Sequence, residues 1–451
     1  MHATIRPHAT ALFGAVLSLC ASASAQSLLH DQGPLVTHPG GGVGGADVSA
    51  LDNSTLWHPA HTVLGFGAQR MLGYSVADEF TVCGAWTVSD LEFFVYQTLA
   101  TPPTITGVYA RIWDGDPRTG GVVRWGDLTT NLLPAAPAGS LHCYRAALGS
   151  ILASDRAVVR IRVPVQGLLL PAGVYWIEMQ FTGSAASGPW VPPVTETGTY
   201  STGHAIQHLV STWVTLDNAA PGGAGVSLPF RVLGTTSQPA PRPAQQWYGV
   251  ARPETGQVPA WGESTPVVGR ETMLRIADGA PGSPPIVLLG TRLPGIAVPP
   301  FGTLYVSPLA SLLLPPFDPL TLLSSRPLQI PHGSGLCGVE LAFQGFWIDP
   351  ATPGGVAHTG GMMLRLGTFS DTISVDRLIE VEVGAETQKV LPVMWSGATV
   401  SVLDPSVATA ELVPWNSGLR LKVRGVRSGQ TILLVRDARN QSVRAFHVTV
   451  P

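Results

Sequence analysis

The sequence predicts an all-β protein, in which a signal peptide is followed by three β-sandwich domains in series. First, 51 glycines and 40 prolines in 451 residues interrupt the chain too often for long helices. Second, apolar and polar residues alternate in many short segments, which is the period of a half-buried strand. Third, 45% hydrophobic residues against 12% charged ones supply enough apolar surface for several cores.

Residues 1–25 have the three parts of a secretory signal peptide. Arg6 gives a positive start, residues 11–19 an apolar centre, and residues 23–25 (Ala-Ser-Ala) a cleavage site of small residues before Gln26. Lipid attachment at Cys20 is the alternative, which the large residue before it disfavours. We expect an exported protein, extracellular or on the cell surface, with the periplasm as an alternative. The apolar run is too short to span a bilayer core of about 30 Å, and no later segment offers a membrane span.

The first half of the mature chain predicts a lead-in and a sandwich. Residues 26–58 are glycine-rich without periodicity, so we expect a flexible lead-in. Residues 60–234 alternate with period two, with turn residues about every ten positions. The clearest strand places Tyr175, Ile177, Met179 and Phe181 on one face and Trp176, Glu178 and Gln180 on the other. This pattern predicts a jelly-roll-like β-sandwich.

The second half predicts a linker and two further units. Residues 235–246 are proline-rich and predict a semi-rigid linker. Residues 247–368 are apolar and rich in glycine and proline, so short strands joined by proline turns are expected. Residues 370–451 alternate most regularly, and about 80 residues is the size of a small immunoglobulin-like sandwich. We expect this last unit to fold on its own.

Cysteine usage agrees with an oxidising compartment. Cys83, Cys143 and Cys337 follow the signal peptide, which allows one disulfide and leaves one thiol. Because Cys83 and Cys143 both fall in the first predicted domain, we expect them to pair. The alternative is three buried, inert thiols.

The last unit resembles two related bacterial patterns. "DPSVATAEL" (404–412), "VRGVRSGQTILLV" (423–435) and "FHVTV" (446–450) are similar to the group-2 bacterial immunoglobulin-like domain. "IEVEVGAETQKVLPV" (379–393) and the Arg-Asp turn at 436–437 are similar to the N-terminal domain of pilus-assembly secretins. The resemblance implies an immunoglobulin-like sandwich in a protein of the cell envelope or surface.

The first two units look like sandwich modules of secreted bacterial proteins of unassigned function. The first unit carries this likeness in "RIWDGDP" (111–117) and "GVYWIE" (173–178). The middle unit carries it in "LQIPHGSGLCGVELAFQGFWIDPATPGG" (328–355). This resemblance implies a fold and assigns no catalytic residue.

Candidate metal ligands are few. Asp114 and Asp116, with Asp127 nearby, offer hard oxygens that suit Ca²⁺, although turns stabilised by Asx hydrogen bonds explain the same residues. His204 and His208 have the spacing of zinc ligands, but the glutamate and the helix that a zinc protease needs are missing, so we expect two ordinary surface or core histidines. The sequence predicts no cofactor, with calcium as the alternative.

Candidate sugar-binding and catalytic residues are also few. Trp125 and Trp190 lie in loop-like sequence and are the candidates for stacking on sugar rings. A glycosidase needs two carboxylates about 5 to 10 Å apart, and Glu178 with Glu196 or Asp114 is the candidate pair.

Charge argues against nucleic acid as a partner. The net charge is −3, and the chain has only two lysines, Lys389 and Lys422. We expect an exported, non-catalytic structural or adhesion protein of a bacterium, with envelope or extracellular proteins or glycans as partners. The alternative is a secreted carbohydrate-binding protein that uses its first sandwich, and a glycoside hydrolase ranks third.

Overall fold

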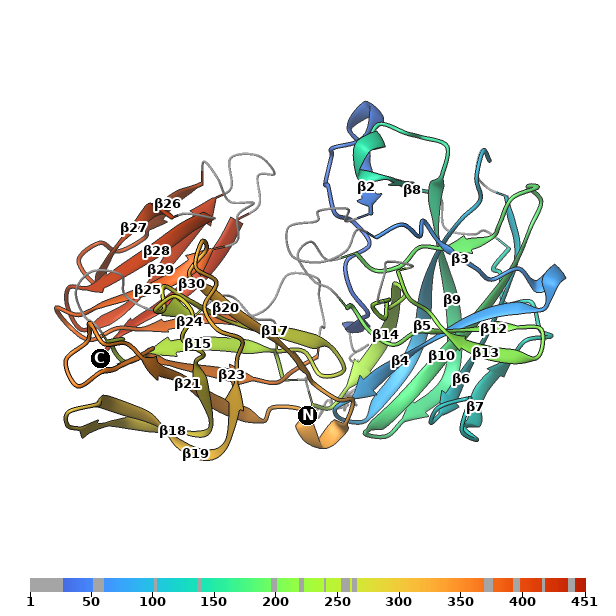
Figure 1. Cartoon of the computed structure of the whole chain (residues 1–451). Coiled ribbons are helices and arrows are strands. Elements are labelled where there is room, and N and C mark those ends of the chain that lie inside the picture. Colours follow the sequence, from blue (N-terminus) through green and yellow to red (C-terminus); the bar gives the residue numbers. More distant parts are fainter. Residues whose placement is uncertain are drawn as a thin grey trace, which may run out of the picture.

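The computed structural model folds the chain into two β bodies (Figure 1). The described residues are 27–51, 61–100, 104–135, 140–195, 201–218, 223–238, 241–252, 260–261, 266–368, 376–391, 398–415, 418–436 and 443–451. Apart from strands they form only the short 3-10 helices η1 (Val43–Gly45), η2 (Arg70–Leu72), η3 (Leu148–Ser150) and η4 (Ser334–Leu336). The all-β class is therefore confirmed. The predicted signal peptide lies outside the described residues, and within them no helix has the length and hydropathy to cross a membrane.

The first body is a sandwich of two sheets, on the right of Figure 1. The eight-stranded sheet has the order β1 (Ser27–Asp31), β14 (Phe230–Thr236), β5 (Trp86–Tyr96), β9 (Ala157–Leu170), β8 (Ser140–Ala146) and β2 (Asp47–Ala50), with β11 (Trp190–Val191) and β3 (Phe66–Gly67) paired beside this path. The six-stranded sheet has the order β13 (Thr212–Thr215), β12 (Ile206–Leu209), β4 (Tyr74–Val82), β10 (Gly173–Gly183), β6 (Ile105–Asp114) and β7 (Val122–Asp127).

The period-two pattern of β10 separates a core face from an outer face. Tyr175, Ile177, Met179 and Phe181 enter the core between the two sheets. On β5 of the facing sheet, Leu91, Phe93 and Val95 enter the same core. Since successive side chains of a strand point to opposite faces, Trp176, Glu178 and Gln180 lie on the outer face of the six-stranded sheet.

The predicted flexible lead-in is wrong for residues 27–51, which belong to the eight-stranded sheet. β1 pairs antiparallel with β14, and β2 pairs parallel with β8. The glycine cluster makes the turn between these strands, where Gly40, Gly44 and Gly45 have positive φ angles that other residues rarely adopt. The glycines thus provide a turn, and the strands on either side pair with partners far along the sequence.

The second body is built on a ten-stranded sheet, on the left of Figure 1. Its order is β19 (Gly302–Leu313), β18 (Ile286–Val298), β21 (Glu340–Ile348), β23 (Gly361–Arg365), β15 (Ala244–Tyr248), β24 (Asp376–Glu380), β30 (Val443–Val450), β29 (Gly429–Arg436) and β26 (Thr399–Val402), with β22 (Val356–His358) paired to β21. Two three-stranded sheets accompany it: β16 (Ala260–Trp261), β17 (Glu271–Ala277) and β20 (Leu323–Gln329), and β25 (Glu386–Leu391), β28 (Gly418–Gly425) and β27 (Ala408–Trp415).

The predicted boundary between residues 368 and 370 does not separate two cores. β15 pairs with β24 in parallel, so one sheet continues from the middle unit into the last one. Trp247 and Met362 of the middle unit share a core cluster with Phe446 and Val448 of the last. Alternation shows which face of a strand is buried, but the partner that buries it is decided by tertiary contacts. The predicted linker is also shorter, because residues 235–246 overlap the end of β14 and the beginning of β15.

Candidate functional site

The three aspartates predicted as calcium ligands have other partners. Asp114 accepts a hydrogen bond from Arg124 Nε at 2.8 Å, and Asp116 accepts one from the backbone N–H of Arg118 at 2.8 Å. Asp127 is held by Thr129 and Thr130, whose hydrogen bonds keep the pKa of this carboxyl well below its usual range.

The same aspartates do not converge on one point. Asp127 stands opposite Ala110, whereas Asp114 stands opposite Val122, four positions further along β6. At 3.3–3.4 Å per residue these two positions are about 13 Å apart along the sheet, too far to share one ion. No group of three or more His, Cys, Asp or Glu side chains with metal-binding geometry occurs among the described residues. The Asx-turn interpretation accounts for Asp116 and Asp127, whereas Asp114 forms an ion pair with Arg124.

The two tryptophans predicted to stack on sugar lie on different sheets. Trp125 is on β7 and packs against the core of the first body. Trp190 is on β11, which pairs with β3 and β5 of the other sheet, and its indole Nε1 donates to Ser187 Oγ at 3.2 Å. The two rings therefore do not form a common platform.

A different set of aromatic side chains gathers on the outer face of the six-stranded sheet. Trp113 stands opposite Trp176 between β6 and β10, and His208 stands opposite Trp213 between β12 and β13. With Tyr109 on β6, these side chains form what we call the outer aromatic face. Sequence reasoning missed it as a set, although the alternation of "GVYARIWDG" and "GVYWIEMQF" places its strand residues opposite the core.

Arginine side chains cover three rings of the outer aromatic face. The guanidinium carbons lie 4.4 Å from the Tyr109 ring centre for Arg70, 4.3 Å from Trp113 for Arg111, and 5.5 Å from Trp176 for Arg118. Stacking of this kind orients the planar guanidinium. Each guanidinium also donates within the protein: Arg70 to the Leu128 carbonyl, Arg111 to Glu178 and Arg118 to Asp116. The face thus combines apolar rings with hydrogen-bond donors.

Glu178 lies buried at the centre of this face. Its carboxylate accepts hydrogen bonds from Ser75 Oγ at 2.6 Å, Arg111 Nε at 2.7 Å and Trp113 Nε1 at 2.9 Å. Asp114, its predicted catalytic partner, is engaged by Arg124, and Glu196 lies outside the described residues. Glu178 therefore acts as an anchor that positions Arg111 and Trp113.

The two histidines with zinc-like spacing have separate environments. Both lie at or beside β12, four positions apart, which is about 13 Å along a strand. The ring of His208 lies 4.9 Å from the ring of Trp213, and Nδ1 of His204 lies 3.4 Å from Glu79 Oε1. They cannot bind one metal ion together, which agrees with their interpretation as ordinary histidines.

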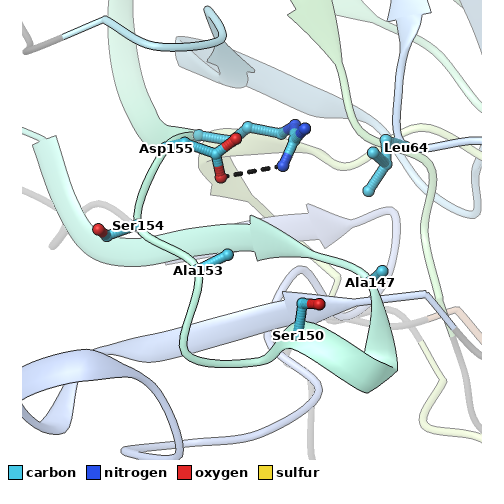
Figure 2. A pocket seen from close by; sticks show the side chains of 7 residues that line it. Leu64, Ala147, Ser150, Ala153, Ser154 and Asp155 are labelled. Carbon is cyan, nitrogen blue, oxygen red and sulfur yellow. Dashed lines mark hydrogen bonds and ion pairs between the residues drawn. The ribbon is translucent and has the colours of Figure 1, made fainter.

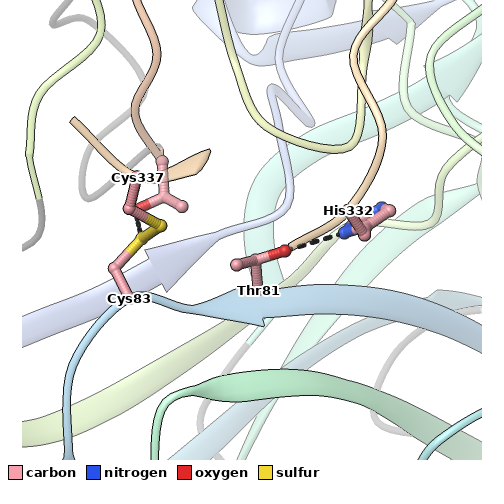
Figure 3. Close-up of a disulfide and its surroundings, with 5 residues drawn as sticks. Thr81, Cys83, His332 and Cys337 are labelled. Atoms are coloured by element: carbon pink, nitrogen blue, oxygen red, sulfur yellow. Dashed lines mark hydrogen bonds between the residues drawn. A yellow bond between two sulfur atoms is a disulfide. The ribbon is translucent and has the colours of Figure 1, made fainter. Parts of the chain in front are cut away.

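The predicted disulfide between Cys83 and Cys143 is wrong. Cys83 follows β4 in the first body and bonds to Cys337 after η4 in the second, 254 residues further along the chain (Figure 3). Cys143 is a buried free thiol that packs with Leu35, Phe94 and Val158. The spacing of cysteines along the sequence gave no means to foresee a bond between the two bodies.

Polar side chains join the two bodies beside this disulfide, and we call this region the junction. His332 Nδ1 lies 2.9 Å from Thr81 Oγ1, and His332 Nε2 lies 3.2 Å from Glu79 Oε1. Figure 3 marks the hydrogen bond between His332 and Thr81 with a dashed line. Burial acts to raise the pKa of Glu79, but hydrogen bonds from His204 and His332 outweigh it and lower this pKa to about 2. Glu79 is therefore charged between the two histidines over most of the pH range.

The junction is tightly packed around these groups. The guanidinium of Arg270 in the second body donates to the backbone carbonyl of Gln32 in the first. Gly269 has a φ of +85°, and a Cβ atom there would overlap the His332 ring. Only glycine allows His332 to approach at this position. A narrow cavity remains between the bodies, lined by His30, Gln32, Thr81, Arg270, His332 and Thr368.

A larger, open depression lies beside η3 of the first body (Figure 2). Its volume is about 470 Å³, and it is lined by Leu64, Ala147, Ser150, Ala153, Ser154, Asp155 and Arg156. Arg156 and Asp155 form an ion pair of 2.9 Å within it, so the one acid among its described lining residues already has a partner. No histidine that could activate its two serines occurs among the lining residues that the structure describes.

No protein-family model and no curated protein matches the chain. Among solved structures it is similar to a putative β-galactosidase from Bacteroides fragilis, with 9% sequence identity and a TM-score of 0.12. The likeness covers 70% of this chain and 35% of that protein, so the chain spans about a third of its length. A TM-score this low carries no conclusion about fold or activity.

Proposed function

We propose that the protein is an exported, non-catalytic structural or adhesion component of a bacterial surface, in which two β bodies are held as one rigid unit. The observation that supports this most is the junction. A disulfide between segments 254 residues apart suits an oxidising compartment, and such bonds are rare in cytosolic proteins.

The polar contacts of the junction support a fixed arrangement of the two bodies. Thr81 and Glu79 of β4 contact His332, and Arg270 contacts the backbone beside β1, so several polar contacts hold the bodies together in addition to the disulfide. A domain pair without such contacts is expected to move by hinge motion. A fixed pair transmits force and keeps its surfaces in constant relative positions, as an adhesion or scaffold protein requires.

A deletion strain tests this proposal. We expect the protein in the extracellular or surface fraction of wild-type cells, and we expect the deletion to impair surface attachment or envelope integrity, with recovery by the wild-type gene. A variant with both Cys83→Ser and Cys337→Ser is expected to restore less than wild type. A cytoplasmic location, or hydrolysis of a glycoside by the purified protein, would refute the proposal.

A second candidate function is carbohydrate binding, and the outer aromatic face favours it. Tryptophan and tyrosine rings stack on the apolar faces of sugars, while arginine edges donate hydrogen bonds to hydroxyl or carboxylate groups. Trp113 and Trp213 are partly exposed on this face. In this candidate function the sugar contacts the outer aromatic face of the six-stranded sheet, and not Trp125 and Trp190 as the sequence predicted.

A further inference from the structure

His30 on β1 is a buried histidine beside the junction. Its ring contacts those of Phe80, Trp86 and Phe230, with ring centres 5.7, 6.4 and 5.4 Å away. Burial lowers the pKa of this imidazole to about 3, and the nearby charge of Arg270 acts in the same direction. The ring is therefore neutral at neutral pH, so one of its nitrogens carries a proton and the other is a hydrogen-bond acceptor.

The side chain of Gln32 decides which nitrogen of His30 carries the proton. The Gln32 amide nitrogen donates to the backbone carbonyl of Glu79 at 3.1 Å and to Ser227 Oγ at 3.1 Å. Because a carbonyl only accepts, this contact fixes the orientation of the amide, and its oxygen Oε1 then lies 2.7 Å from His30 Nε2. Nε2 of His30 is therefore the donor, and Nδ1 is the acceptor.

Nδ1 of His30 is a buried acceptor for which the described residues provide no donor. Such an atom is costly, and nearly all buried polar atoms of proteins are paired either with the protein or with an ordered water. His30 also lines the narrow cavity between the two bodies, together with Thr81 and His332, which Figure 3 labels. An acceptor that lacks a protein donor thus belongs to a residue that borders an enclosed space.

The cavity has the size and the polar lining of a site for one water molecule. It offers about 10 Å³ to the centre of a water-sized sphere, and roughly 10–15 Å³ on this measure holds one molecule. Its lining includes Asp31 of the first body and Arg270 and Thr368 of the second, which carry a carboxylate, a guanidinium and a hydroxyl. A buried water needs about two to four polar partners. An anion fits less well, because the carboxylate of Asp31 repels it.

We propose that one internal water molecule occupies this cavity, donates a hydrogen bond to His30 Nδ1 and accepts one from Arg270 of the second body. The water then connects β1 to the second body at a place where no direct contact satisfies the histidine. Because both bodies line the cavity, this bridge forms only when they are docked. The inference concerns the junction itself and does not depend on the function proposed above.

A high-resolution crystal structure of the mature full-length chain tests this inference directly. We expect a single water peak about 2.7–3.2 Å from His30 Nδ1, with a second contact to Arg270. Crystals soaked in bromide should show no anomalous peak in the cavity, because the site is one for water and not for an anion. A cavity without density, a bromide peak inside it, or a protein donor on Nδ1 would each overturn the inference.

Magnetic relaxation dispersion of the water signal, which counts long-lived internal waters, tests it in solution. His30→Gln should hold about one such water fewer than wild type, because its amide can still donate to Gln32 but places no acceptor where Nδ1 lies. His142→Gln is the matched control, since His142 is an exposed histidine of β8 in the same body, and its count should equal that of wild type. Circular dichroism establishes that both variants are folded. An unchanged count in folded His30→Gln would contradict the inference, and if this variant does not fold, the wild-type crystal structure decides.

Discussion

Nε2 of His332 in the second body lies 3.2 Å from Oε1 of Glu79 in the first body. Nδ1 of His204 lies 3.4 Å from the same oxygen, so one carboxylate receives a histidine from each body. The stability of the junction therefore depends on the charge of Glu79 and on the protonation of His204.

We expect the contribution of Glu79 to stability to be greatest at weakly acidic pH. Its pKa is lowered from 4.5 to about 2, so its stabilising effect is complete above pH 4.5 and is lost as the pH falls toward 2. The pKa of His204 is raised above 6.5 by its hydrogen bond with Glu79, so its effect is complete below pH 6.5 and is lost as the pH rises further.

Glu79→Gln should therefore lower the free energy of unfolding by about 2 kcal/mol between pH 4.5 and 6.5, and by less on either side of this window. Chemical denaturation of wild type and variant at several pH values measures this difference. A difference that does not change with pH would mean that the carboxylate acts through packing alone.

Breaking the disulfide should destabilise the pair of bodies. In the chain-entropy model, a bond that closes a loop of this length stabilises the folded chain by about 5–6 kcal/mol. Cys337→Ser should lower the free energy of unfolding by about this amount, while the far-ultraviolet circular dichroism stays that of a β protein.

Thiol counting checks the pairing itself. The mature, non-reduced protein should show one reactive thiol in denaturant, and peptide mapping should show Cys83 joined to Cys337. Cys143 should not react in the native protein, because burial raises its pKa to about 12. A peptide that joins Cys83 to Cys143 would contradict the structure.

A fragment of residues 371–451 should not unfold cooperatively by itself. β24 lies between β15 and β30 in the shared sheet, and the Lys389 ammonium lies 3.7 Å from the centre of the Trp247 ring. Removing the middle unit therefore exposes one face of the last one. Thermal melting followed by circular dichroism should show a broad transition for the fragment and a sharp one for residues 241–451.

Trp247→Ala in the full chain tests the same contact without truncation. It should cost about 3–5 kcal/mol, because a large buried ring is removed from a core that both units share. Two separate transitions in the wild-type second body would show that its two units unfold independently.

If the second candidate function holds, a glycan array probed with the mature chain should show binding that Trp213→Ala or Trp113→Ala reduces by about 1–2 kcal/mol. Trp190→Ala is the matched control, because this ring lies on the other sheet. If the array shows no binding, and the three substitutions change only the stability of the protein, the structural role is the single remaining candidate.

Local patterns were sufficient for the class of the fold. The alternation around Tyr175 and Trp176 placed these residues on opposite faces of a strand, and the structure confirms it. The same alternation did not reveal that Trp113 and Trp213 join Trp176 on one face, because strand neighbours are set by register between distant segments.

Composition predicted local structure less well where a segment pairs with strands that are distant in the sequence. Residues 27–51 looked flexible because their glycines break every local period, yet Asp47 pairs with the strand that holds Cys143. Hydrogen bonds to a strand about 100 residues away stabilise such a segment without any local signal.

The sequence alone determined the all-β class and the two faces of its regular strands, because both follow from side-chain period and from the backbone limits of glycine and proline. Only the tertiary structure decided which distant residues are neighbours. Cys83 bonds to Cys337, Glu79 contacts His332, and β15 pairs with β24 and so joins the middle unit to the last one. These contacts join residues that are far apart in the chain. Their free energy arises only when both surfaces are already folded, so no local pattern records them.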